Sequence, residues 1–385
     1  MPGVAAAAIM VFVTAIGFFI TPALLGGRKE TMITQIIIDQ VQQTMNWEFA
    51  GAVSVLLLVV VLAVFAIYDK VLGLSTMTGA ASARVRASGG ASLSRRAGDA
   101  VLTLLAGVSD RLFDLLPRRL RRSVSGTGQS RTLWWIVLLV LAFLAAPAFL
   151  MIPLSFDSGS GLTWPPKGFS LQWYEQMFTS AVWMQAITRS LIVGVGTGLL
   201  AMLIGTPAAF LLVRADLRGK SAMLAFVLSP IVVPRMIIAV GMFYFFARVG
   251  LVGSSIGLIL AHTVVAVPYV VITMMAVLRN YDTRLDLAAQ SLGAGPWATL
   301  RFVTFPILAA GLMSSFLFAF ATSFDELTIA LFATGGLNAT LPKQFWDEVT
   351  LQISPVIAAV STCLFLFIAT LIWLADRLRR RSLAG

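Results

Sequence analysis

Long apolar runs separated by polar segments dominate the chain. Each run is close to the roughly 20 residues that a helix needs to cross a bilayer core about 30 Å thick. The runs do not alternate between apolar and polar positions, and they contain the glycines and prolines that transmembrane helices tolerate. The pattern predicts an all-α membrane protein with about eight transmembrane helices, two before a long basic segment and six after it. The predicted spans are Val4–Leu25, Ala50–Leu72, Leu133–Pro153, Leu191–Val213, Ala222–Ala247, Val252–Leu278, Val303–Thr328 and Val356–Ala375.

Composition agrees with this pattern and argues against a soluble enzyme. The 385 residues are 58% hydrophobic and 12% charged, with a mean hydropathy of +0.91. Soluble domains carry about 25% charged residues. The chain has one cysteine, Cys363, and one histidine, His262, so we expect no metal site built from these residue types. Neither residue has a catalytic partner in the sequence, and we expect no enzymatic activity in the chain itself.

Positive charge is concentrated beside the spans. The net charge is +11, and arginines crowd the segment 70–132 and the C-terminal end. Such runs can bind nucleic acid. Because both clusters flank spans, the positive-inside rule explains them better, and we expect the lipid bilayer rather than nucleic acid as the partner. With 70–132 inside, alternation of the spans places both termini and the loops 214–221 and 279–302 on the cytoplasmic side.

The basic segment also divides the chain. Residues 75–98 have the Gly, Ala, Ser and Arg composition of a flexible linker. Residues 99–117 have apolar positions at helical spacing, which predicts an amphipathic helix on the inner leaflet. The predicted domains are therefore a two-helix part at 1–74, a basic cytoplasmic linker at 75–130 and a six-helix part at 131–385. Within the latter, the glycine-rich run 194–198 lies in a span, so we interpret it as close helix packing rather than a dinucleotide site.

The loop 281–306 predicts two short helices on the cytoplasmic side. Its first helix carries a small-sided apolar stripe at helical spacing. Gly293 suits the left-handed residue that ends a helix, and Pro296 suits the first position of the next one. A short, exposed, alanine-rich helix is typical of an element that docks into a groove on a partner. The stripe consists of Leu285, Ala288, Ala289 and Leu292.

This loop resembles the "EAA" coupling loop of ABC importer permeases. The match rests on Ala288-Ala289, on Gly293-Ala294, and on the hydrophobic stretch that ends at Pro306. One position departs from the family, because Leu287 stands where the family has glutamate, with Asp286 one position earlier. The coupling residues implied by the resemblance are Asp286, Leu287, Ala288, Ala289, Gly293, Ala294, Phe302 and Pro306.

The resemblance implies a type I ABC importer transmembrane domain in a bacterial cytoplasmic membrane. Its expected partners are a dimer of cytoplasmic ATPase subunits, a periplasmic substrate-binding protein and a second permease half. ATP and Mg would bind to the ATPase partner, and no cofactor is expected in this chain.

The match extends over 131–385 and resembles the second permease of spermidine/putrescine importers. It is carried by the segments 168–174, 218–220, 323–326 and 353–355. Segment 1–74 is similar to the end of the first permease of the same branch. Together with a weak internal similarity between the two parts, this implies a fusion of two permeases that lacks the first four spans. A natural two-helix remnant is the alternative.

Four ionisable residues lie in or beside the predicted spans, where charge is costly and usually functional. They are Arg235, His262, Asp325 and Glu326. One interpretation is an internal pair of Arg235 with Asp325 or Glu326. The other is a lining of the translocation path. An arginine in the path suits an anionic solute better than a polyamine, so another small organic or anionic solute remains an alternative. An ion-coupled secondary transporter using the two carboxylates is a further alternative.

Overall fold

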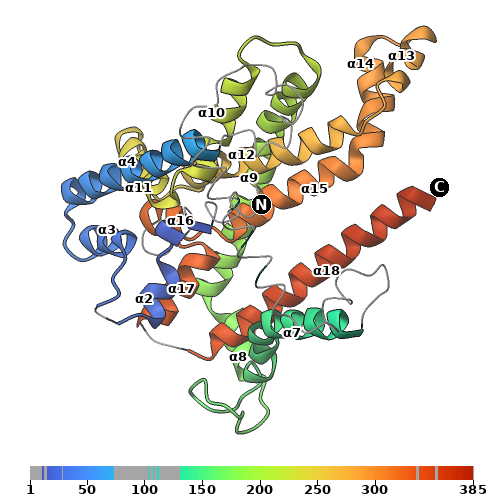
Figure 1. Cartoon of the computed structure of the whole chain (residues 1–385). Coiled ribbons are helices and arrows are strands. Elements are labelled where there is room, and N and C mark those ends of the chain that lie inside the picture. The colour runs from blue at the N-terminus through green and yellow to red at the C-terminus, as the bar shows by residue number, and fades with distance from the viewer. Residues whose placement is uncertain are drawn as a thin grey trace. The chain divides into compact units, whose positions relative to one another are not determined.

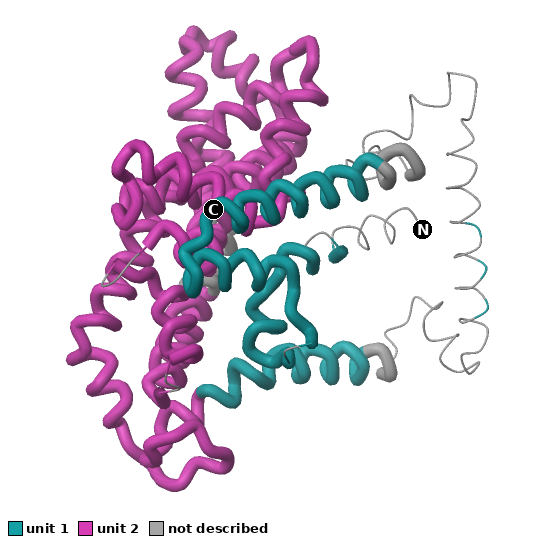
Figure 2. Tube along the Cα trace, turned by 90° about the vertical axis from the view of Figure 1, so that its left-hand side faces the viewer, with its two compact units in different colours: residues 1–151 teal, residues 152–385 magenta. Residues whose placement is uncertain are grey.

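The structure is a computed structural model that describes residues 11–12, 15–27, 29–72, 131–334, 338–351 and 354–384, with three isolated residues between 103 and 111. The chain forms two compact units, residues 1–151 and 152–385 (Figure 2). The predicted linker 75–130 and its amphipathic helix lie almost entirely outside the described residues. The division into 1–74, 75–130 and 131–385 therefore stays a prediction.

The first unit contains short helices followed by long apolar ones. Helix α3 packs on α4, and buried Ile37, Ile38 and Val41 face that contact. The predicted first span is interrupted in its described part, because the helix breaks at residues 17–19 before α2 begins. The helices are α2 (Ile20–Leu25), α3 (Ile33–Gln42), α4 (Trp47–Leu72) and α7 (Arg131–Leu154), the last of which continues across the unit boundary.

The described residues of the second unit form helices and one π-helical turn. Its long helices are α9 (Ala181–Arg214), α12 (Ser255–Arg279), α15 (Phe305–Phe324) and α18 (Val356–Ala384). Its shorter elements are α8 (Gln172–Thr179), α10 (Lys220–Val232), α11 (Arg235–Val249), α13 (Arg284–Ser291), α14 (Pro296–Thr299), the π turn η3 (Leu300–Thr304), α16 (Thr328–Ala333) and α17 (Leu341–Leu351).

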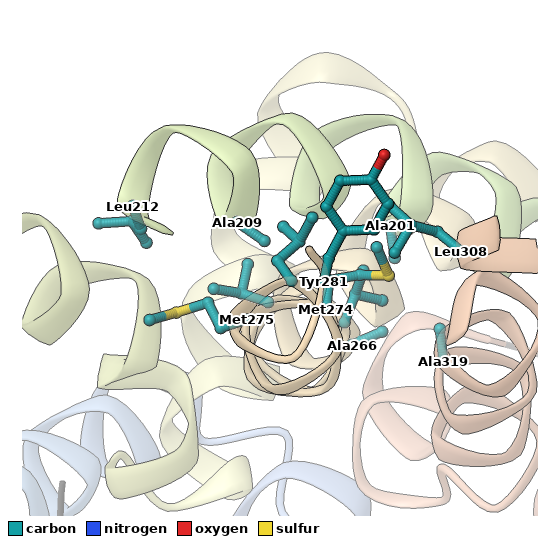
Figure 3. Packing of buried hydrophobic residues seen from close by; sticks show 12 residues of the cluster. Ala201, Ala209, Leu212, Ala266, Met274, Met275, Tyr281, Leu308 and Ala319 are labelled. Carbon is teal, nitrogen blue, oxygen red and sulfur yellow. The ribbon is translucent and has the colours of Figure 1, made fainter. Parts of the chain in front are cut away.

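The core of this unit lies where α9, α12 and α15 pack against one another. Alanines on these helices face larger side chains such as Met274 and Leu308 across the contact (Figure 3). The glycines of the run 194–198 allow the close approach. A Cβ atom on Gly194 would come within 2.9 Å of Phe320, and one on Gly198 within 2.7 Å of Phe316. The prediction of helix packing for this run is confirmed.

The described helices support a membrane-spanning fold. Five of them are long and apolar enough to cross a bilayer, and a bent pair provides a sixth candidate. The spans predicted at 50–72, 133–153 and 252–278 correspond closely to α4, α7 and α12. Helix α9 begins ten residues before the predicted span, because Ser180 caps it by accepting the backbone N–H of Trp183.

Two predicted spans require correction. The run Ala222–Ala247 is not one helix, since α10 and α11 meet at a 97° bend. Pro234 causes the break because proline disfavours helical geometry in the residue before it, and Val233 is extended. The run Val303–Thr328 also ends early, at Phe324. Arg235 therefore lies at a helix break rather than in mid-span, and Asp325 and Glu326 follow the end of α15.

Candidate functional site

Helices α13 and α14 lie at the far end of the α12–α15 pair (Figure 1). The local sequence explains this double turn. Gly293 has φ of 88°, a conformation that favours glycine, and it ends the first helix. Pro296 is the first residue of α14, where its missing N–H costs nothing. Both features, and the two short helices themselves, confirm the prediction from the sequence.

The segment from α13 to η3 carries large apolar side chains that are exposed. Leu287 is 61% exposed and Leu292 is 89% exposed. Trp297 and Phe302 are 68% and 72% exposed. We call these four residues the docking surface. Ala288 and Pro306 are also exposed, whereas Ala289 and Ala294 are half-buried. Large apolar side chains grouped in this way are typical of a surface that another protein covers.

Asp286 points in the opposite direction, toward the rest of the unit. Arg214, the last residue of α9, donates from Nη1 to its Oδ2 at 2.8 Å. Tyr281 Oη donates to Oδ1 at 2.6 Å, and Thr304 Oγ1 donates to the same oxygen at 2.9 Å. We call these four residues the Asp286 cluster. It joins α13 to the ends of α9, α12 and η3.

Charge and aromatic contacts reinforce the cluster. The Arg214 guanidinium carbon lies 5.1 Å from the ring centres of both Phe210 and Tyr281. Burial of Asp286 raises the pKa of its carboxyl, but the hydrogen bonds from Tyr281 and Thr304 and the charge of Arg214 outweigh burial and hold that pKa below its usual value. Burial and the hydrogen bond to Asp286 raise the pKa of Tyr281.

The π turn η3 brings Thr304 to this cluster. Its backbone closes an i→i+5 bond from the N–H of Phe305 to the carbonyl of Leu300. A π turn accommodates one more residue than an α turn, and one residue corresponds to about 100° of rotation on an α-helix. The extra residue lies between α14 and α15. It therefore determines the direction in which the Thr304 side chain points, and this direction is toward Asp286.

A second polar group lies where α11 begins and α15 ends. Glu326 is fully buried, and its Oε2 accepts the backbone N–H of Ile329 at 2.7 Å, at the start of α16. Its Oε1 lies 3.9 Å from Nη1 of Arg235, whose side chain is 39% exposed. Asp325 is exposed. The structure thus brings Arg235 together with Glu326, which is one of the two pairs considered from the sequence.

His262 is buried in α12 and faces α15. Its Nδ1 lies 2.8 Å from Ser323 Oγ, and that hydroxyl lies 3.2 Å from Thr197 Oγ1 on α9. His262 is the eighth residue of α12, which begins at Ser255. Its hydrogen bond thus joins the three helices that form the core.

Sequence reasoning missed several of these partners. The sequence does not indicate Arg214, Tyr281 or Thr304 as partners of Asp286. Their sequence positions carry no signal of a shared contact, because 72 residues separate Arg214 from Asp286. Ser323 and Thr197 around His262 were missed for the same reason. Among the described residues, no group of three His, Cys, Asp or Glu side chains is placed to hold a metal ion.

Comparison with known proteins places this geometry in a family. Residues 201–383 match the family described as "Binding-protein-dependent transport system inner membrane component". The spermidine/putrescine transport system permease protein PotC of Haemophilus influenzae is 29% identical over 244 residues, which are 63% of this chain and 94% of that protein. The putrescine transport system permease protein PotI of Escherichia coli K12 is 31% identical over 242 residues, 60% of this chain and 85% of that protein.

More distant similarities agree with these. The molybdenum transport system permease protein ModB of Mycobacterium bovis is 29% identical over 198 residues, 48% of this chain and 74% of that protein. A solved bacterial ABC transporter involved in the import of alginate matches with a TM-score of 0.51 and 14% identity, over 66% of this chain and 99% of that one. The expected fold class, an all-α transmembrane domain of the type I importer kind, is confirmed. The chain is a multi-pass membrane protein that belongs to the family of binding-protein-dependent transport system inner membrane components.

Proposed function

We propose that this chain is the permease subunit of an ATP-driven importer that receives a small solute, of the polyamine class, from a binding protein. The observation that carries the proposal is the docking surface, formed by exposed apolar residues along the segment from α13 to η3. A groove on a cytoplasmic ATPase subunit is the occupant that the family implies. The remaining partners are a second permease half and a periplasmic binding protein.

The side on which the docking surface lies follows from charge. The Arg214–Asp286 ion pair joins the loop after α9 to the loop after α12, so both loops belong to the same end of the unit. The two loops carry Arg218, Lys220, Arg284 and Arg301. Because cytoplasmic loops are enriched in arginine and lysine, we assign this end to the cytoplasm and, by alternation, both termini as well.

Capture of the ATPase tests the docking surface. The permease, the ATPase and the binding protein would be co-expressed, solubilised and purified through a tag on the permease. Leu292→Glu places a charge on the docking surface without disturbing a buried contact, since this side chain is 89% exposed. Leu351→Glu is the matched control, because Leu351 is 80% exposed at the end of α17.

We expect wild type and the control to capture the ATPase, and Leu292→Glu to lose it. Equal capture by all three would reject the docking surface. No capture by wild type would reject the ATP-driven importer and favour a secondary transporter, which a proton or sodium ionophore would then inhibit.

The proposed solute class rests on the relatives and on two carboxylates, of which one is exposed and one is buried. Two similar proteins are named for putrescine or spermidine transport. Asp325 is an exposed carboxylate that suits a cationic amine, and we assign it, with the partly exposed Arg235, to the translocation path. Glu326 and His262 are buried, so they would hold the helices of that path in place rather than line it. Uptake of labelled putrescine into proteoliposomes, with unlabelled spermidine as competitor, tests this class.

An anionic solute is the second candidate. The Arg235 side chain is 39% exposed. Among the described residues it is paired with one carboxylate, that of Glu326. The molybdenum permease among the similar proteins also favours it. Uptake of labelled molybdate, but not of labelled putrescine, into the same proteoliposomes would decide for the anion.

A further inference from the structure

We infer that Asp286 is a positioning residue that transmits the movement of the docking surface to the spans α9 and α15. The inference rests on the proposed function, because it takes the ATPase as the occupant of the docking surface. It concerns the inner side of α13, which no ATPase residue would contact.

The first argument is the direction of the side chains along α13. Leu287, next to Asp286, is 61% exposed on the docking surface, whereas the Asp286 side chain is 12% exposed. Consecutive residues of a helix point about 100° apart, so one turn of α13 presents its apolar side outward and its carboxylate inward. The helix therefore has a partner face and an anchored face.

The second argument is what the carboxylate holds. Its two oxygens accept three hydrogen bonds, from Arg214, Tyr281 and Thr304, at 2.6 to 2.9 Å. A charge-assisted pair of this length is directional and resists separation. Arg214 ends the 34-residue helix α9, and Thr304 immediately precedes α15. A displacement of α13 is thereby passed to two core helices at once.

The third argument is how few other connections α13 has. Most of its residues are exposed, and the side-chain hydrogen bonds that the described residues make from α13 to α9 and η3 are those of the Asp286 cluster. Coupling between distant sites requires a contiguous set of contacts with more than one stable arrangement. The π turn beside Thr304 provides such a segment. If it changed into an α turn, which holds one residue fewer, α15 would rotate relative to α14.

The test uses the assembled transporter in proteoliposomes, with the ATPase and the binding protein loaded with putrescine. The variants are Asp286→Asn, which removes the charge, and Asp286→Glu, which restores it. Asp282→Asn is the matched control, because Asp282 is an exposed residue of the same loop whose carboxylate accepts the nearby N–H of Arg284. The readout is the ratio of stimulated to basal ATP hydrolysis, measured per bound ATPase.

We expect Asp286→Asn to lower this ratio about tenfold, within the range of coupling between linked sites. Asp286→Glu should restore most of it, and the control should match wild type. A ratio in Asp286→Asn equal to that of wild type overturns the inference. Wild type that captures no ATPase instead overturns the proposed function, so the two failures are distinguishable.

A spectroscopic measurement separates transmission from simple folding. Nitroxide labels at Arg218→Cys and Arg284→Cys, in a Cys363→Ser background, report the distance between the loop after α9 and α13. We expect one narrow distance distribution in wild type and Asp282→Asn, and a broader one in Asp286→Asn. A broad distribution with an unchanged hydrolysis ratio would show a structural role only and would overturn the inference.

Discussion

The buried carboxyl group of Glu326 accepts the backbone N–H of Ile329 at 2.7 Å through one oxygen, and its other oxygen lies 3.9 Å from Nη1 of Arg235. Both interactions lie at the break between α15 and α16. A buried donor that loses its acceptor costs about 1–3 kcal/mol.

Replacement of this residue should separate the two interactions. Glu326→Gln keeps an oxygen for Ile329 and loses only the charge facing Arg235, whereas Glu326→Ala loses both. We expect the melting temperature in detergent to fall more for the alanine variant, with Glu175→Ala, at an exposed position of α8, as the control. Equal melting temperatures for the two variants would show that the hydrogen bond to Ile329 contributes nothing.

Gly198 should tolerate no side chain, because a Cβ atom there would come within 2.7 Å of Phe316. Overpacking of this kind costs about 1–3 kcal/mol. We expect Gly198→Ala to lower the melting temperature and Phe316→Leu to restore part of it in the double variant. Gly241→Ala is the control, since nothing lies within 4 Å of that position. A helical glycine replaced by alanine gains up to about 1 kcal/mol.

Gly293 and Gly295 make a matched pair in the coupling loop. Neither has an atom within 4 Å of an added Cβ, but Gly293 has φ of 88° and Gly295 has φ of −68°. A left-handed conformation costs an L-residue about 1–2 kcal/mol. Gly293→Ala should therefore change the angle between α13 and α14 and weaken ATPase capture, whereas Gly295→Ala should match wild type. Similar capture by both variants would contradict this explanation.

The Asp286 cluster predicts a dependence of stability on pH. Because the folded-state pKa of Asp286 is held below the usual value of 3.8, its contribution is complete at pH values above 3.8 and is lost as the pH falls through the folded-state value. We expect the difference in melting temperature between wild type and Asp286→Asn to be constant from about pH 7 to 5. Below that interval it should shrink. A difference that grows on acidification would have the wrong sign.

The sequence predicted the elements that depend on local chemistry. The paired short helices follow from the positions of Gly293 and Pro296, and the close contact at Gly194 and Gly198 follows from residue size. The long apolar runs located most spans, because the length of a run is a property of neighbouring residues.

What the sequence could not supply depends on tertiary contacts. The bend at Pro234 was missed because transmembrane helices tolerate proline, and hydrophobicity does not distinguish a kink from a 97° break. The partners of Asp286 come from positions 214, 281 and 304, which only the packing of α9, α12 and α15 brings together. Residue type alone gave no reason to choose Arg214 over the other loop arginines.

At the bend between α10 and α11, the backbone of this unit has polar groups that need hydrogen-bond partners. The last carbonyls of α10 and the first N–H groups of α11 have no helical partner of their own. Inside a hydrocarbon layer such groups require either protein donors and acceptors or a water-filled cavity. Arg235 follows the bend directly, and its charge imposes the same requirement. A straight helix at this place would satisfy these backbone groups within itself, whereas the bent pair leaves them to partners outside the helix.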